Sequence, residues 1–106
     1  MNPKISWPNK KKFAFTVFDD TDRANLKNNQ LVYKFLNELG FKTTKSVWIN
    51  QNSSTENGIT CEDKNYLNWL LELKNKGFEI GYHNTTYHSS NREEIEEGLK
   101  KFKLIF

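Results

Sequence analysis

Apolar and polar residues alternate along the chain in blocks that predict strands and helices in turn. Three short blocks are rich in β-branched and aromatic residues, which favour strands. They are 13–18 (FAFTVF), 43–49 (TTKSVWI) and 78–82 (FEIGY). The first block is almost continuously apolar or β-branched, which is typical of a parallel strand covered on both faces.

Helical periodicity marks the segment that follows each strand. Helices are predicted over 25–39, over 64–76 and from SSNREE onward, where Ser90 and Glu93 have the spacing of a capping box. Asp63 precedes the second helix as an N-cap, and a glycine ends each of the first two helices. The expected buried stripes are Leu31, Phe35, Leu36 and Leu39; Tyr66, Trp69, Leu70 and Leu73; and Ile95, Leu99 and Phe102.

The order β-α-β-α-β-α predicts an α/β fold of three βα units, in which right-handed crossovers join the strands of a parallel sheet. We assign residues 1–12 to a lead-in and residues 13–106 to a single domain, in keeping with the length of 106 residues. A polar loop over 50–60 (NQNSSTENGIT) separates the second strand from the second helix and is longer than most connections.

Charge and hydropathy narrow the function classes. The net charge is +3, but the lysines are spread over the predicted helices among glutamates, so we expect no nucleic-acid partner. Mean hydropathy is −0.82 and no apolar run approaches the roughly 18–20 residues of a membrane span, so no membrane association is expected. The basic N-terminus lacks the apolar stretch of a signal peptide, which favours a cytoplasmic location. Cys61 is the only cysteine, which excludes an internal disulfide.

Ionisable side chains gather where the first and third predicted strands end. Asp19 and Asp20 follow the first strand, His83 follows the third, and His88 lies in the next loop. Because the carboxyl ends of parallel strands share one rim of the sheet, we expect these four side chains to meet there. The alternative is structural: paired aspartates can cap a helix, and histidines in a polar loop can be surface residues.

Two imidazoles and one carboxylate are a common ligand set for a catalytic divalent metal. Zinc suits these ligands, and cobalt, manganese, iron and nickel are alternatives. Three protein ligands leave a coordination position open, and the second carboxylate can then act as general base toward the attacking water. A cation would also remove the repulsion between Asp19 and Asp20. The sequence therefore predicts a hydrolytic metal site.

The stretch TVFDD, followed by a helix, a strand, a helix and then GFEIGYHNTTYHSSNREEIEEGLKKF, resembles the polysaccharide deacetylase family, whose domain is the NodB-homology domain. The resemblance runs over 13–102. It implies the first part of a distorted (β/α)7 barrel that removes N- or O-acetyl groups by metal-assisted attack of water. It also implies that Asp19 is the catalytic base and that Asp20, His83 and His88 bind the metal. Acetylated carbohydrate or a related small molecule is then the expected partner.

Three features depart from the family pattern. Thr21 and Asp22 replace the usual glycine-proline, four residues rather than three separate the histidines, and three βα units stand where a (β/α)7 barrel needs more. Three parallel strands cannot close a barrel, so we expect an exposed sheet edge and a homo-oligomer. One alternative is a catalytically inactive metal-binding or interaction module of the same fold. A third is a receiver-like signalling domain, although its phospho-accepting aspartate would stand at the position of His83.

Overall fold

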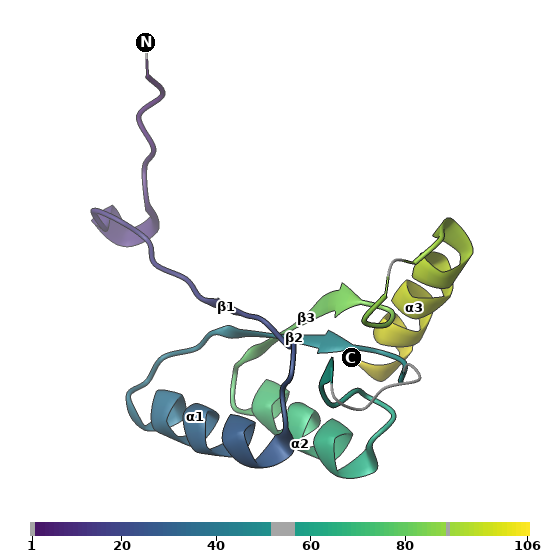
Figure 1. Ribbon diagram of the computed structural model, residues 1–106. Helices are drawn as coiled ribbons and strands as arrows, with labels where there is room; N and C mark the ends of the chain where they lie inside the picture. The colour runs from purple at the N-terminus through teal and green to yellow at the C-terminus, as the bar shows by residue number, and fades with distance from the viewer. Residues whose placement is uncertain (1, 52–56, 89) are drawn as a thin grey trace.

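The computed structural model describes residues 2–51, 57–88 and 90–106 (Figure 1). In chain order, the elements are the 3₁₀ turn η1 (Pro8–Lys10), β1 (Phe18–Asp19), α1 (Leu26–Glu38), β2 (Thr44–Trp48), α2 (Lys64–Asn75), β3 (Glu79–Asn84) and α3 (Arg92–Ile105). The strands form one parallel sheet in the order β1-β2-β3. This confirms the predicted α/β class with a parallel sheet. Part of the predicted polar loop, 52–56, lies outside the described residues.

β1 is much shorter than the strand predicted over 13–18. Its two residues pair with β2, opposite Thr44 and Lys45. Because β2 begins at Thr44, whose N–H donates to the Val17 carbonyl, residues 13–16 extend past the neighbouring strand and leave the sheet as an exposed arm (Figure 1). The predicted strand overlaps β1 only at Phe18, and the expected burial on both faces is wrong, since a sequence pattern does not show where the neighbouring strand begins.

β2 and α2 form the centre of the core. β2 is buried along its whole length, because β1 and β3 flank it on both sides. The buried apolar cluster contains Tyr33, Val47, Ile49, Cys61, Tyr66, Trp69, Leu70, Leu73 and Phe78. All four residues of the predicted α2 stripe belong to this cluster, so that prediction is confirmed.

α1 presents a different face to the core than the one predicted. Tyr33 is its buried residue, and its ring makes edge-to-face contacts with Trp69 and Phe78, at centroid distances of 5.5 and 5.2 Å. Leu36 of the predicted stripe is half-buried. The other three members are exposed: Leu31, Phe35 and Leu39. The prediction of a buried stripe was wrong for these three, because nothing among the described residues covers that side of the helix.

α3 begins one residue later than predicted. Its capping box joins Asn91 and Glu94: the Asn91 side chain accepts from the Glu94 backbone N–H, and the Glu94 carboxylate accepts from the Asn91 backbone N–H, both over 2.9 Å. Ser90 and Glu93 have the same spacing but do not form the cap. Two neighbouring pairs therefore carried the same signal, and only the structure distinguishes them.

A glycine lets α3 pack closely on the end of β3. A Cβ added at Gly98 would collide with the side chain of Thr85, so no larger residue fits without a shift of the helix. Phe102, one turn further, reaches the ring of Tyr82 at a centroid distance of 5.9 Å. Phe102 is half-buried, whereas the other two members of the predicted stripe, Ile95 and Leu99, are exposed.

The three α-helices are short and amphipathic. Their polar faces carry lysines and glutamates, such as the Lys100–Glu96 pair of α3, whose charged atoms lie 2.7 Å apart. Across the described ranges, no helix has the length and apolar character needed to cross a lipid bilayer.

Candidate metal centre

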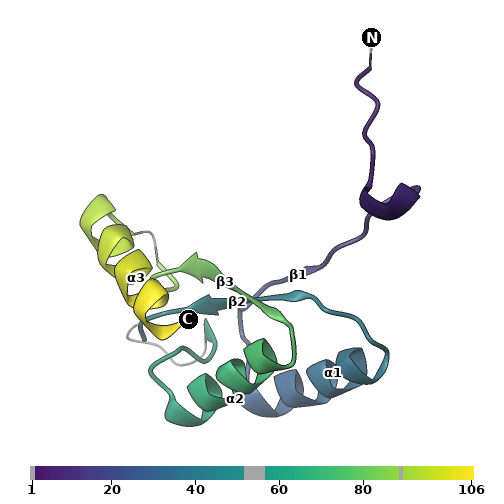
Figure 2. The same ribbon diagram turned by 180° about the vertical axis from the view of Figure 1, so that it is seen from behind.

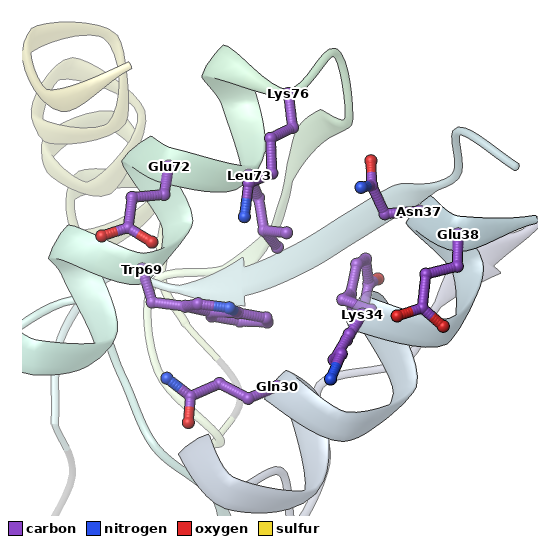
Figure 3. A pocket seen from close by; sticks show the side chains of 9 residues that line it. Gln30, Lys34, Asn37, Glu38, Trp69, Glu72, Leu73 and Lys76 are labelled. Atoms are coloured by element: carbon purple, nitrogen blue, oxygen red, sulfur yellow. The ribbon is translucent and has the colours of Figure 1, made fainter. Parts of the chain in front are cut away.

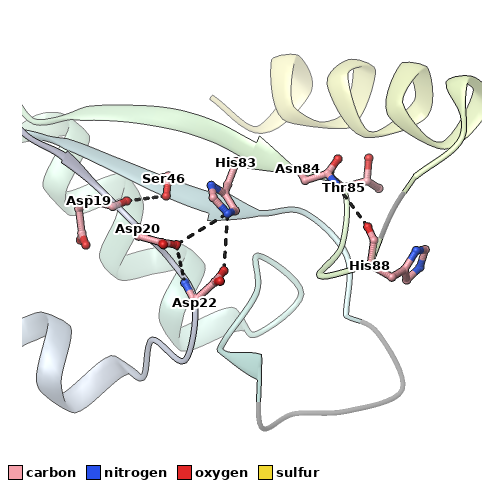
Figure 4. Close-up of polar contacts among 8 residues, drawn as sticks. All are labelled: Asp19, Asp20, Asp22, Ser46, His83, Asn84, Thr85 and His88. Atoms are coloured by element: carbon pink, nitrogen blue, oxygen red, sulfur yellow. Dashed lines mark hydrogen bonds and ion pairs between the residues drawn. The ribbon is translucent and has the colours of Figure 1, made fainter.

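Three ionisable side chains meet at one rim of the sheet (Figure 4). The Nε2 atom of His83, in β3, lies 3.7 Å from Oδ1 of Asp20 and 3.6 Å from Oδ1 of Asp22. One potential ligand atom from each residue lies within 4.8 Å of the other two. Donor atoms that are each about 2.1 Å from a shared ion stand roughly 3–4 Å apart. The spacing of these three residues therefore fits a divalent cation.

His83 reaches this rim because β3 runs further than predicted and contains a bulge. β2 and β3 pair in register up to Val47 and Tyr82, but Trp48 then pairs with Asn84, so His83 is an extra residue. Bulges re-aim side chains and are frequent next to functional sites. The imidazole packs beside the buried Trp48 ring at a centroid distance of 5.8 Å, which gives the histidine a firm support.

A tight turn after β1 brings Asp22 to the same side of the sheet as Asp20. The backbone N–H of Asp22 donates to Oδ1 of Asp20 over 3.0 Å, and Thr21 between them is fully buried. Arg23 has a φ of 58°, in the left-handed region that few non-glycine residues adopt. This is the segment that departs from the glycine-proline of the resembled family. Asp22 was missing from the predicted ligands, although the third carboxylate of DDTD was the available signal.

A second loop braces this turn. The backbone N–H of Arg23 donates to the carbonyl of Asn57 over 2.7 Å, and the N–H of Ile59 donates to the carbonyl of Ala24 over 2.9 Å. Gly58 lies between these contacts with a φ of 124°, and a Cβ there would stand 2.9 Å from a carbonyl oxygen of the turn. A glycine is thus needed for the two segments to approach so closely.

Asp19, the predicted base, points to the other side of β1 (Figure 4). Its Oδ2 accepts a hydrogen bond from the Tyr33 hydroxyl over 2.8 Å and lies 3.2 Å from Nζ of Lys45. Burial lowers the pKa of Lys45, and the charge of Asp19 opposes that shift. Burial also raises the pKa of Tyr33, as do its hydrogen bond to Asp19 and the Asp19 charge. The Asp19 carboxylate therefore serves here as counter-ion and acceptor on the α1 side, and its role as base stays a prediction.

His88, the second histidine of the predicted ligand set, lies apart from the three converging residues (Figure 4). Its backbone carbonyl accepts a 3.4 Å hydrogen bond from the Asn84 amide, and its imidazole points away from the cluster. Among the described residues, the group that could hold a metal consists of Asp20, Asp22 and His83. Of the four predicted site residues, the structure thus brings Asp20 and His83 together and adds Asp22.

Two grooves lie near the helices and β1, and the one beside β1 includes Asp20 in its lining. A groove of about 440 Å³ runs between α1 and α2, with Trp69 in its wall and charged residues such as Lys34 and Glu72 at its edge (Figure 3). A second groove, of about 370 Å³, lies beside β1 and is lined mainly by apolar side chains, including Val17 and Val32. The three converging side chains are instead open to solvent, so a substrate would approach them from outside the sheet.

Comparisons with known proteins leave the family open. Searches against protein-family models, curated proteins and solved structures found no match for the chain. The resemblance to polysaccharide deacetylases therefore stays a prediction from motifs, and the chemistry of the site is judged on its geometry.

Proposed function

We propose that the chain binds a divalent cation through Asp20, Asp22 and His83 and acts as a metal-dependent hydrolase of acetylated carbohydrate or a related small molecule. The observation that carries this proposal is the convergence of two carboxylates and an imidazole at the rim where parallel α/β sheets carry active sites. The motif resemblance supplies the reaction class, hydrolysis of an N- or O-acetyl group. In that reading the sheet corresponds to the first part of a distorted (β/α)7 barrel.

The donor set is richer in oxygen than the predicted one. Two carboxylates and one imidazole suit manganese or iron as well as zinc, because carboxylate oxygens favour the harder cations. A bound cation of this kind polarises an acyl carbonyl and lowers the pKa of water. Asp20 and Asp22 would hold the cation from the turn after β1, and His83 would hold it from β3. Side chains distant in sequence would thus bind the same cation.

A second function, metal binding without catalysis, is favoured by the position of Asp19. The carboxylate that the motif assigns to the base contacts Lys45 and Tyr33 on the opposite side of β1. A general base must come within hydrogen-bond reach of the proton that it removes. With Asp19 held there, the cluster would bind a cation but would not deprotonate the attacking water. The two functions therefore differ in turnover and not in metal content.

Calorimetric titration of chelator-treated protein with Mn²⁺ and Zn²⁺ tests the site. We predict one bound equivalent for the parent and at least about tenfold weaker binding for His83→Ala and for Asp22→Asn, since each change removes one of three ligands. His88→Ala is the matched control and should bind as the parent does. A loss in His88→Ala with none in Asp22→Asn would instead support the ligand set predicted from sequence, and a parent that binds neither ion would refute the site.

Acetate release from an acetylated chito-oligosaccharide then separates the two functions. Turnover that needs the metal and disappears in Asp20→Asn supports the hydrolase, whereas stoichiometric metal without acetate release supports the non-catalytic module. Asp19→Asn assigns the base: loss of turnover at unchanged metal affinity would give Asp19 the role that the motif implies.

A further inference from the structure

The side of the molecule formed by α1, β1 and the arm before β1 is apolar and exposed. We call it the β1–α1 surface; its members are Phe13, Phe15, Val17, Phe18, Leu31, Val32, Phe35 and Leu39, each more than two-fifths exposed. Phe13 and Phe15 reach 77% and 73%. The groove beside β1 joins the two parts of the surface, because Val17 and Val32 both line it. Contiguous apolar patches of this kind mark interaction sites.

The same surface contains an open sheet edge. Among the described strands, β2 has a neighbour on each side, whereas β1 pairs with β2 alone. No backbone hydrogen bond between described residues joins 13–16 to another segment, and this arm runs as an extended chain away from the helices (Figure 2). Natural proteins protect free edges with lysine, proline or bulges, and the stretch FAFTV contains neither lysine nor proline. An edge of this kind is suited to adding another strand.

We infer that a second copy of the chain covers this surface in a two-fold dimer, with the two arms paired antiparallel. The area of the surface matches such a partner. Its eight side chains expose on average more than half of their surface. At roughly 150–200 Å² for a large side chain, this amounts to on the order of 800 Å² per copy. A stable interface of standard size buries about 800 Å² on each partner.

The charge pattern fixes the orientation of the two arms. A run of three lysines precedes the arm, and three aspartates within four positions follow it. A two-fold axis at Thr16 sets Lys12 of one copy opposite Asp20 of the other. Opposite charges then meet at both ends of the paired arms, whereas a parallel arrangement would set like charges together. Asp20 is also a ligand in the proposed metal site, but the pairing of the arms needs no bound cation.

Sedimentation equilibrium in a chelator-containing buffer tests the dimer separately from any metal. The parent should have about twice the chain mass of 12.6 kDa. Phe15→Lys and Phe35→Glu should each shift the protein to monomer, because each places a charge in the interface. Leu104→Glu is the matched control: Leu104 is 87% exposed on α3, outside the β1–α1 surface, so this variant should stay dimeric. Circular dichroism checks that every variant is folded.

Two results would overturn the inference: a parent that is monomeric at every concentration reached, or a dimer that both surface variants leave intact.

Oxidative cross-linking tests the register. At a two-fold axis, facing Cα atoms are about 4.5–5.5 Å apart, within disulfide range. Thr16→Cys should therefore form a covalent dimer rapidly. Ala14→Cys is the control, because its two copies would lie about 13 Å apart along the strands. Equal cross-linking of both would reject the proposed pairing.

Discussion

α1 and α2 begin alike and end in different surroundings. They contain 13 and 12 residues, and each starts with a polar cap whose side chain accepts a hydrogen bond from the backbone N–H three residues on. Both have an apolar stripe. In α2 that stripe is buried against β2 and the segment before β3. In α1 most of it faces outward, and Tyr33 on another side of the helix contacts the core.

The contrast shows that the apolar stripe of a helix is buried only where the sheet beside that helix is wide enough to cover it. β2 has a strand on each side, and the apolar stripe of α2, the helix that packs on it, is buried. β1 contributes two residues to the sheet and, among the described residues, has one free edge, so much of the apolar stripe of α1 has no strand to pack against. The amphipathic pattern of a helix determines which of its residues can be buried. The number of strands beside the helix determines which of them are buried.

The largest expected effect compares one leucine from each helix. Leu70→Ala in α2 should lower the free energy of unfolding by about 2–5 kcal/mol, because a fully buried side chain leaves a cavity. Leu31→Ala in α1, at a side chain that is 63% exposed, should cost less than about 0.5 kcal/mol at concentrations where the chain is monomeric. Urea unfolding measures both. Equal losses would mean that the two helices are packed equally well.

Cys61, in the well-packed half, offers a pH test. Burial raises the pKa of its thiol from 9.0 to about 12. Above pH 9 the unfolded chain loses this proton and the folded chain keeps it, so stability falls as pH rises toward 12. The loss between pH 8 and 10 should be about 1.4 kcal/mol, and Cys61→Ala should lack it. A parent and a variant with parallel pH curves would contradict the buried thiol.

The same thiol can be compared directly with one in the other half. A thiol reagent at pH 8 should label Cys61 only when the protein unfolds. In the Leu31→Cys variant, the introduced thiol should react in the folded state at concentrations where the chain is monomeric. Fast labelling of Cys61 in the folded parent would remove the difference between the two halves.

The smallest effect concerns the two caps. Asn25→Ala and Asp63→Ala should each cost about 1 kcal/mol, because each removes one acceptor from an otherwise unpaired N–H at a helix start. Thermal unfolding of both variants gives the comparison. Similar losses would place the origin of the contrast in tertiary packing, whereas a much larger loss at one cap would place it in the helix start itself.

The sequence predicted those parts of the fold in which local pattern and packing agree. The prediction of the α2 stripe was correct because the period and the cap define the helix and the facing strand covers the predicted face. The stripe of α1 was as regular, yet the packed residue is Tyr33, whose neighbours Trp69 and Phe78 lie far along the chain. The length of β1 failed for a related reason: the start of β2 at Thr44 sets it, and nothing within FAFTVF records that position.

The site was predicted to the extent that it follows from topology. Asp20 and His83 meet because the ends of parallel strands share a rim. Asp22 joins them through a turn with a left-handed Arg23, which depends on the loop braced against it. The bulge at His83 was not predictable from residue types, because it depends on how the residues of β2 and β3 pair across the sheet.

The order β1-β2-β3 in the sheet is also the order of synthesis. A nascent chain completes β1, α1 and β2 first, but in this unit most of the α1 stripe is exposed. Its core closes only after α2 and Phe78 have left the ribosome and β3 can be laid beside β2. Co-translational folding of this domain therefore waits for its third strand, and until then the arm and the first helix are surfaces that chaperones can recognise.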